Sequence, residues 1–260
     1  MRLALLSDIR GNPIALDAVL EDITAHGGAD ECLVLGDLVA IGHDPLGVLE
    51  RLARLPVAHF VQGNTDRYVV TGQRPYPSVG EAIRDTRLVP RLVEVAHSFA
   101  WTQGVVTAGG WLEWLGALPL EDHFTLADGT RVRAVHVAPG QDEGMGVHPR
   151  LSDDELSDVL GGANADLVCV GHTHWPVDRI VRGVRVVNPG SVSNPLASDL
   201  RASYAVIDST HTGYQVEHRR VPYDLDAVIA AIRHSHHPAG EFIISHFRGE
   251  RQPWWLADAE

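Results

Sequence analysis

The segment LLSDIRGNPIAL, residues 5 to 16, decides how the chain begins to fold. Its apolar run ends in Asp8, and a proline with a 3.6-residue apolar pattern follows, which predicts a buried strand that leads into a helix. The runs ECLVLGD and VAHFVQGN end in the same way, in Asp37 and in Asn64. Strands that alternate with helices indicate right-handed βαβ crossovers and a parallel sheet. Ligands bind at the carboxyl ends of such strands, so we expect these three polar residues at one site.

The second half of the chain favours antiparallel hairpins. Three pairs of apolar runs each flank a turn that contains glycine, at Asp128-Gly129, at Arg182-Gly183 and at Thr212-Gly213. Such turns between two apolar runs are typical of hairpins. A parallel first half and a hairpin-rich second half predict an α/β (α+β) fold of two sheets that pack face to face, with helices outside.

Two segments differ from this alternation. Residues 67–118 have few strand signals and several helical stretches, which predicts a helical insertion. Residues 236–260 have the composition of short helices or a C-terminal arm. No linker or repeat divides the chain, so we expect one domain, residues 1–260.

Composition narrows the function classes. The net charge of -13 argues against a groove for long nucleic acid, because that affinity comes mostly from phosphate neutralisation. The chain has no lysine, which excludes a Walker A lysine and a Schiff-base mechanism. Its first apolar run is too short for a signal peptide or a membrane span. Cys32 and Cys169 lie in apolar runs and do not form a disulfide framework, so we expect a cytoplasmic protein with no membrane partner.

Six polar residues follow the predicted strands and form a candidate metal site: Asp8, Asp37, Asn64, His136, His172 and His174. Oxygen and imidazole donors together suit manganese, iron, nickel or zinc better than an all-oxygen calcium or magnesium site. In an extended segment His172 and His174 face the same side. A carboxylate between two ions about 3.5 to 4 Å apart would help them to acidify a shared water.

The ordered motifs SDIRGN, LGDLV, QGNTD, the lone His136, VGHTHWP and NPGSV resemble those of the calcineurin-like metallophosphoesterase superfamily, within its small bacterial and archaeal phosphodiesterase-like branch. The resemblance runs from Asp8 to about Asp208. It implies a four-layer αββα sandwich of two mixed sheets flanked by helices. It also implies two metal sites, the first formed by Asp8, the residue at position 10, Asp37 and His174, and the second by Asp37, Asn64, His136 and His172.

Three positions depart from the family motifs. The usual Asp-x-His is here Asp8-Ile9-Arg10, the usual Gly-Asn-His is Gly63-Asn64-Thr65, and Val137 stands where a glycine often follows the strand histidine. Two interpretations of Arg10 stay open, because arginine is not a metal ligand. In one, the guanidinium binds the substrate phosphate while the other three ligands hold the first ion. In the other, which we favour, it pairs with Asp8 and weakens the first site by repulsion.

The replacement by Thr65 removes an imidazole that often serves as a general acid. Protonation of the leaving group then falls to water or to another residue such as His43, and general-acid help worth roughly 10² to 10⁴ in rate is reduced or lost. Good leaving groups should therefore be favoured.

The sequence as a whole predicts a cytoplasmic, metal-dependent phosphoesterase that hydrolyses a small phosphodiester or phosphomonoester, with nucleotides as one option, by attack of a metal-bound hydroxide. We expect Arg10, Asp37 and Asn64 to be catalytic, Arg10, Asn64 and Thr65 to bind the substrate, and manganese to be the metal. The alternative is a metal- or nucleotide-binding regulatory module whose catalysis is weakened because Arg10 and Thr65 replace the family histidines. The oligomeric state stays open, a homodimer included.

Overall fold

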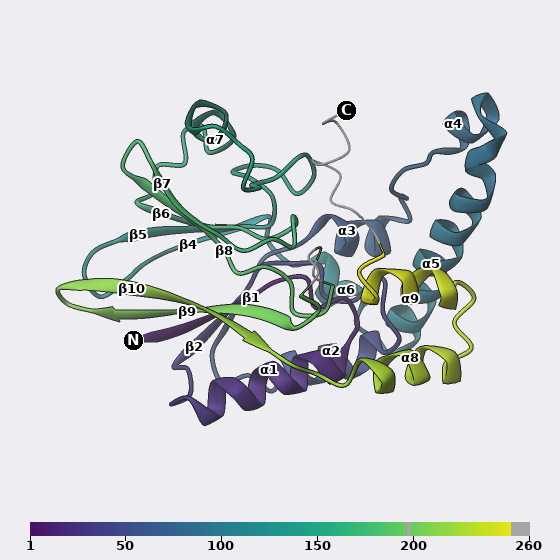
Figure 1. Ribbon diagram of the computed structural model, residues 1–260, viewed down its shortest axis with the longest axis horizontal. Helices are drawn as coiled ribbons and strands as arrows, with labels where there is room; N and C mark the ends of the chain where they lie inside the picture. Colours follow the sequence, from purple (N-terminus) through teal and green to yellow (C-terminus); the bar gives the residue numbers. More distant parts are fainter. Residues whose placement is uncertain (195, 197–198, 251–260) are drawn as a thin grey trace.

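The computed structural model describes residues 1–194, 196 and 199–250 of the chain. Its strands form two five-stranded mixed sheets, which we call sheet A and sheet B (Figure 1). Sheet A has the order β10-β9-β1-β2-β3, with β1 (Arg2–Leu6), β2 (Glu31–Val34), β3 (Ala58–Phe60), β9 (Ala202–Thr210) and β10 (Gly213–Val221). Sheet B has the order β4-β5-β6-β8-β7, with β4 (Glu121–Thr125), β5 (Arg131–Val135), β6 (Leu167–Cys169), β7 (Val177–Val181) and β8 (Val184–Asn188). The pairs β1–β2, β2–β3, β5–β6 and β6–β8 are parallel and the remaining pairs are antiparallel.

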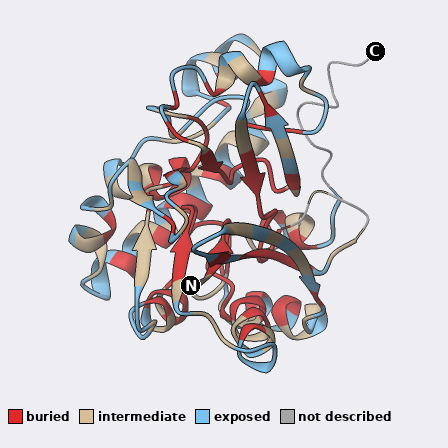
Figure 2. Ribbon diagram, turned by 90° about the vertical axis from the view of Figure 1, so that its left-hand side faces the viewer, coloured by how far each residue is buried: buried red, intermediate tan, exposed pale blue. Residues whose placement is uncertain are grey.

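The two sheets pack face to face because their strands are apolar on both sides. In β1, Leu3 and Leu5 belong to the inter-sheet core, while Ala4 and Leu6 belong to the cluster under the helices. This alternation follows from the two-residue period of a strand. Figure 2 shows the buried residues on the strands between the layers and on the inner sides of the helices.

Helices cover the outer faces of both sheets. The helices α1 (Pro13–Ala25), α2 (Pro45–Leu52) and α8 (Leu225–His234) pack against sheet A, and α7 (Asp153–Val159) packs against sheet B (Figure 1). The remaining helices, which gather beyond the carboxyl ends of the strands, are α3 (Asn64–Thr71), α4 (Val79–Arg84), the 3-10 turn η1 (Thr86–Leu88), α5 (Val89–Ala108), α6 (Leu112–Gly116) and α9 (Gly240–Phe247). The predicted four-layer αββα sandwich is confirmed.

Local signals set the helix starts. Asn12 caps α1 by accepting the N–H of Ala15, and Asp44 caps α2 by accepting the N–H of Gly47, with a proline as the next residue in each case. A side-chain acceptor satisfies an N–H that the first turn leaves unpaired, and proline loses nothing at that position. These caps fix where the chain turns away from the ends of β1 and β2. None of the described helices is long and apolar enough to cross a membrane.

Candidate metal centre

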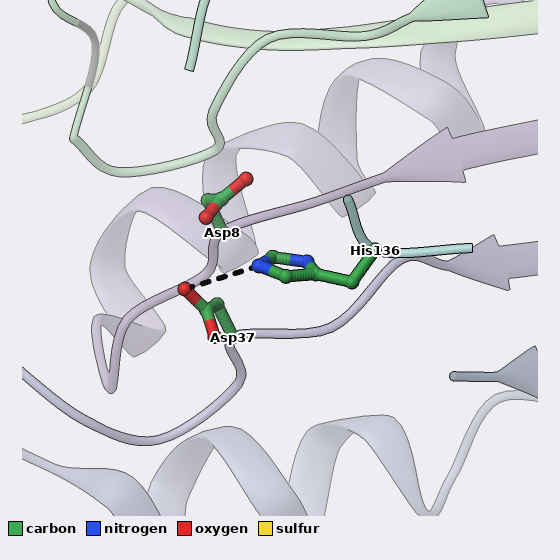
Figure 3. A group of neighbouring side chains, drawn as sticks. All are labelled: Asp8, Asp37 and His136. Carbon is green, nitrogen blue, oxygen red and sulfur yellow. Dashed lines mark ion pairs between the residues drawn. The ribbon is translucent and has the colours of Figure 1, made fainter. Parts of the chain in front are cut away.

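The polar residues predicted from the sequence gather where strands of both sheets end. Asp8 follows β1, Asp37 follows β2, and His136 follows β5 from the other sheet; Figure 3 shows these three side chains turned toward one another. One ligand atom of each lies within 4.8 Å of the others. All three residues are fully buried. The two sheets therefore bring two carboxylates and an imidazole to one buried point, which is a donor set that can hold a divalent metal.

The backbone at this point is held in an uncommon conformation. Among the described residues, nine that are not glycine have positive φ, and five of these nine belong to the predicted site: Asp8, Arg10, Asp37, His172 and His174, with φ between 56° and 68°. L-residues rarely adopt this region, and they keep it only where surrounding contacts over-determine it. Here the N–H of Asp8 donates to the Gly36 carbonyl at 3.1 Å, and the N–H of Arg10 donates to the Asp37 carbonyl at 3.0 Å. The strained turns aim neighbouring side chains into one cluster.

Two glycines of the motifs are required by close approach. A Cβ on Gly36, which has a φ of 82°, would lie 2.9 Å from Nδ1 of His136. A Cβ on Gly63 would lie 2.2 Å from Oδ1 of Asp37. The glycines in LGD and QGN are therefore what allows the second and third strand ends to approach each other and His136.

Arg10 occupies the middle of the predicted first metal site. Its Nη2 lies 3.1 Å from Oδ1 of Asp8, 2.5 Å from Oδ2 of Asp37 and 2.9 Å from Nε2 of His174. These are the three protein donors that the resemblance assigns to the first ion. Burial lowers the pKa of Arg10, but Asp37 and Asp8 outweigh it and raise the pKa, so the guanidinium stays charged. A fixed organic cation stands where the family places a metal.

The predicted second site brings three donors together around His136. Its Nδ1–H donates to the Leu35 carbonyl at 2.6 Å, which fixes the ring and directs Nε2 toward the site. Nε2 lies 3.2 Å from Oδ1 of Asn64 and 3.4 Å from Oδ2 of Asp37. Burial lowers the pKa of His136, but the Asp37 carboxylate and the other contacts raise it to about 9. An imidazole nitrogen and two oxygens that converge in this way can share a proton or hold a metal ion.

His172 stands at the edge of this second group. Its ring lies beside that of His136, with centroids 5.2 Å apart, and its Nε2–H donates to the Gly144 carbonyl at 2.9 Å. That bond leaves Nδ1 as the nitrogen with the lone pair. Burial and the neighbouring His136 lower the pKa of His172 to about 4, so the ring is neutral near pH 7. A neutral imidazole is the form that binds metal.

His174 is oriented toward the first site. Its Nδ1–H donates to the Asn194 carbonyl, which directs Nε2 at Arg10 and leaves it 3.0 Å from Oδ1 of Asp8. Thr65, predicted as a substrate contact, donates both its N–H, at 2.9 Å, and its hydroxyl, at 2.7 Å, to Oδ1 of Asp37. A hydroxyl has one proton, so this geometry favours a role for Thr65 in positioning Asp37. His43 is not among the residues that line the cavity beside the site.

Two further elements position the site: Asp66, whose role was not predicted from the sequence, and a segment that contains the NPGSV motif. The buried carboxylate of Asp66 accepts the N–H groups of Asp37, Leu38 and Gly63 at 2.8 to 3.1 Å, and so ties the LGD loop to the QGN loop. Burial and the charge of Asp37 raise the pKa of Asp66 to about 7. The only signal in the sequence was its place in the QGNTD motif.

The second element is the NPGSVSN segment, residues 188 to 194, which contains the NPGSV motif of the resemblance. Ser191 donates its hydroxyl to the Asp8 carbonyl at 3.0 Å, and Asn188 donates its side-chain amide to the Gly171 carbonyl at 2.7 Å. The segment therefore braces the loops that carry Asp8 and His172.

Comparison with known proteins agrees with this architecture. Residues 1–212 match the family model of the calcineurin-like phosphoesterase superfamily domain. An uncharacterised protein of Methanocaldococcus jannaschii is 29% identical over 238 residues, which cover 86% of this chain and 88% of the relative. A hypothetical protein from Pyrococcus horikoshii superposes with a TM-score of 0.79 at 20% identity, over 96% of this chain and 99% of the other. A metallophosphoesterase from Sphaerobacter thermophilus superposes with a TM-score of 0.73 at 24% identity, again over 96% and 99%. At these identities the two structures show a shared fold.

Proposed function

Because the chain belongs to the calcineurin-like phosphoesterase superfamily, we propose that it hydrolyses a small phosphate ester with the help of one tightly held divalent ion. The ion would be held by Asp37, Asn64, His136 and His172. The observation that carries this proposal is the contact of Arg10 Nη2 with Asp8, Asp37 and His174, which fills the place of a second ion.

The second-site residues fit a metal by the chemistry of their donors. The buried Nε2 of His136 faces oxygens of Asn64 and Asp37, which is a set of donors that a divalent ion could bind in place of a proton. His172 adds a neutral imidazole beside them. Two oxygen donors and two imidazoles suit manganese, with iron, nickel and zinc as alternatives. When bound, such an ion acidifies water and neutralises charge on the phosphoryl group.

The first-site residues do not fit a second ion while Arg10 holds its position. Its Nη2 lies 2.5 to 3.1 Å from all three first-site donors and so occupies the space in which they would coordinate an ion. The guanidinium neutralises part of the charge of Asp8 and Asp37 instead. Burial raises the pKa of Asp37, but Arg10 and His136 outweigh it and hold the pKa of this carboxyl well below its usual range.

Arg10 also lines the cavity next to the site. Only its Nη2 makes the contacts with Asp8, Asp37 and His174. A guanidinium has five N–H donors in a planar fork, so its other edge can bind phosphoryl oxygens while Nη2 stays in place. Arg10 would then stabilise the charge that develops on the phosphoryl oxygens during the reaction. This role takes phosphate binding from one of the two interpretations of Arg10 and the weakened first metal site from the other.

The test is turnover of bis(4-nitrophenyl) phosphate by the full chain with added manganese. We expect Asp37→Asn and His172→Ala to lose at least about 100-fold in kcat/KM, because each removes a donor to the ion whose charge stabilisation amounts to several kcal/mol. His123→Ala, at an exposed position on β4, is the matched control and should keep full activity. Wild-type turnover no faster than that of the two variants would overturn the catalytic proposal and favour a regulatory module that keeps the fold. The cytoplasmic location stays a prediction.

A further inference from the structure

A cavity of about 310 Å³ opens beside the metal centre. At one end it is lined by Arg10, Asn64 and Thr65. The opposite wall comes from two segments that are far apart in the sequence, α5 in the predicted insertion and α9 in the predicted arm. Its size is at the small end of the range for ligand pockets, which suits one phosphate with one compact organic group.

The wall formed by the two helices is largely apolar. It contains Val95 and Phe99 of α5 and Phe242 of α9, and Ile41 from the loop after β2 also lines the cavity. The same helices add the polar residues Arg91 and His246. An inorganic phosphate or a small polar ester would leave this wall unused. An apolar group placed there would gain about 25 cal/mol for each Å² removed from water.

The charged residues that line the cavity favour an anionic ligand. No aspartate or glutamate is among the described residues that line the cavity, although the chain has a net charge of -13. Two arginines line it, Arg10 at the metal end and Arg91 on α5. The carbon at the centre of the Arg91 guanidinium lies 4.2 Å from the centroid of the Phe242 ring, which joins the two helices in a cation–π contact. A guanidinium is flat and stacks on aromatic faces, so the pair forms a surface suited to a further ring.

We propose that this cavity binds the organic part of the substrate, and that this part is an aromatic ring, with the phosphate at Arg10 and the ring against Arg91 and Phe242. The proposal rests on the proposed function and names its substrate class, a phosphate ester with an aryl or nucleobase-like group. It makes Arg91 and Phe242 specificity-determining residues. It also gives α9 a role, which is to close the cavity opposite the insertion.

The first test measures binding without hydrolysis. Titration calorimetry of the manganese-loaded full chain compares phenylphosphonate with methylphosphonate, which share the anionic group and differ in the ring. We expect phenylphosphonate to bind roughly 10-fold more tightly or better, because burial of a ring contributes more than burial of a methyl group. Arg91→Gln and Phe242→Leu should reduce the preference to less than about 3-fold. The ratio of the two affinities is the readout, because Arg91→Gln also removes a positive charge that acts on both phosphonates.

A matched control and a second arm keep the test sharp. Arg87→Gln, on the same insertion but with a fully exposed side chain paired with Asp85, should leave the preference unchanged. Arg91 is only half-buried, so its variant keeps the test valid where Phe242→Leu fails to fold. In kinetics, the ratio of kcat/KM for bis(4-nitrophenyl) phosphate to that for methyl 4-nitrophenyl phosphate should be lower in Arg91→Gln and Phe242→Leu than in the wild type. Both diesters release 4-nitrophenolate, and their intrinsic difference in reactivity is the same for every variant.

Three outcomes distinguish failure of the aromatic-substrate proposal from failure of the proposed function. A phenyl preference that Arg91→Gln and Phe242→Leu remove, and that Arg87→Gln keeps, supports the proposal. Equal affinity of the two phosphonates overturns it, even in a chain that hydrolyses diesters well. Binding of neither phosphonate together with no diester turnover overturns the proposed function as well.

Discussion

At the scale of single residues, Arg10 is the departure from the motifs of the resemblance that changes the charge of the predicted first metal site. Its guanidinium is buried between two carboxylates and an imidazole, where it completes the charge balance that a metal would otherwise provide. A buried charge of this kind persists only when it is paired, because desolvation of an unpaired ion costs several kcal/mol. Asp8 and Asp37 are therefore as necessary to Arg10 as Arg10 is to them.

This balance leads to a prediction about metal content. We expect Arg10→His to raise bound manganese from about one to about two ions per chain, because it removes a fixed cation and supplies the nitrogen that the first site lacks. Elemental analysis after dialysis against micromolar manganese measures the ratio. Arg87→Gln, which removes an exposed arginine elsewhere, should stay at the wild-type ratio. A ratio in Arg10→His that equals the wild type would contradict our account of Arg10.

At the scale of elements, sequence patterns predicted the helices, turns and strand ends that are determined by residues close together in the chain. The helix after Asp8, the hairpin turn at Arg182-Gly183 and the polar residues at strand ends all follow from nearest neighbours in the chain. The contact between Arg91 and Phe242 joins positions about 150 residues apart, and no local pattern encodes such a pairing. A periodic apolar stripe shows which side of a helix is buried, but it does not identify the partner.

The connection between α8 and α9 contains a buried histidine that predicts a pH dependence of stability. The ring of His237 lies 4.4 Å, centroid to centroid, from that of Trp101 on α5, and its Nδ1 accepts the N–H of Ala239. Burial lowers the pKa of His237 to about 4.

Residues 251–260 of the predicted arm lie outside the described residues.

Because the folded pKa lies below the ordinary value of 6.5, His237 costs no stability above about pH 6.5 and costs more as the pH falls toward 4, where the unfolded chain takes up a proton that the folded chain resists. We expect the Tm of the wild type to fall further between pH 7 and pH 5 than that of His237→Asn, whose amide oxygen can still accept the Ala239 N–H. Differential scanning calorimetry at both pH values measures the change. His234→Asn, at an exposed position at the end of α8, should follow the wild type. Parallel curves for His237→Asn and wild type would show that this histidine does not carry the effect.

At the scale of the whole molecule, the site depends on how the two sheets pack. Asp8 and Asp37 come from sheet A, while His136 and His172 come from sheet B, so the donors meet only when the inter-sheet core is formed. If the two sheets separated while each stayed folded, the donors would move apart and the site would be lost. The proposed function therefore requires the two sheets to stay packed together, and an unfolding experiment that follows both sheets tests the expectation of one domain.

We expect Leu167→Ala to destabilise both sheets together. Leu167 is fully buried on β6 in the inter-sheet core, and such a truncation costs about 2 to 5 kcal/mol. Urea unfolding followed by far-UV circular dichroism reports on all elements, while tryptophan fluorescence includes Trp114, which packs edge-on against Phe60 at the far side of sheet A. The two probes should shift to the same lower midpoint, since a two-state domain unfolds as one unit. Ile180→Ala, exposed on β7 of the same sheet, should stay within about 0.5 kcal/mol of the wild type. A fluorescence midpoint that stays in place while the dichroism midpoint falls would show that the elements do not unfold as one unit, and the chain would then have more than one folding unit.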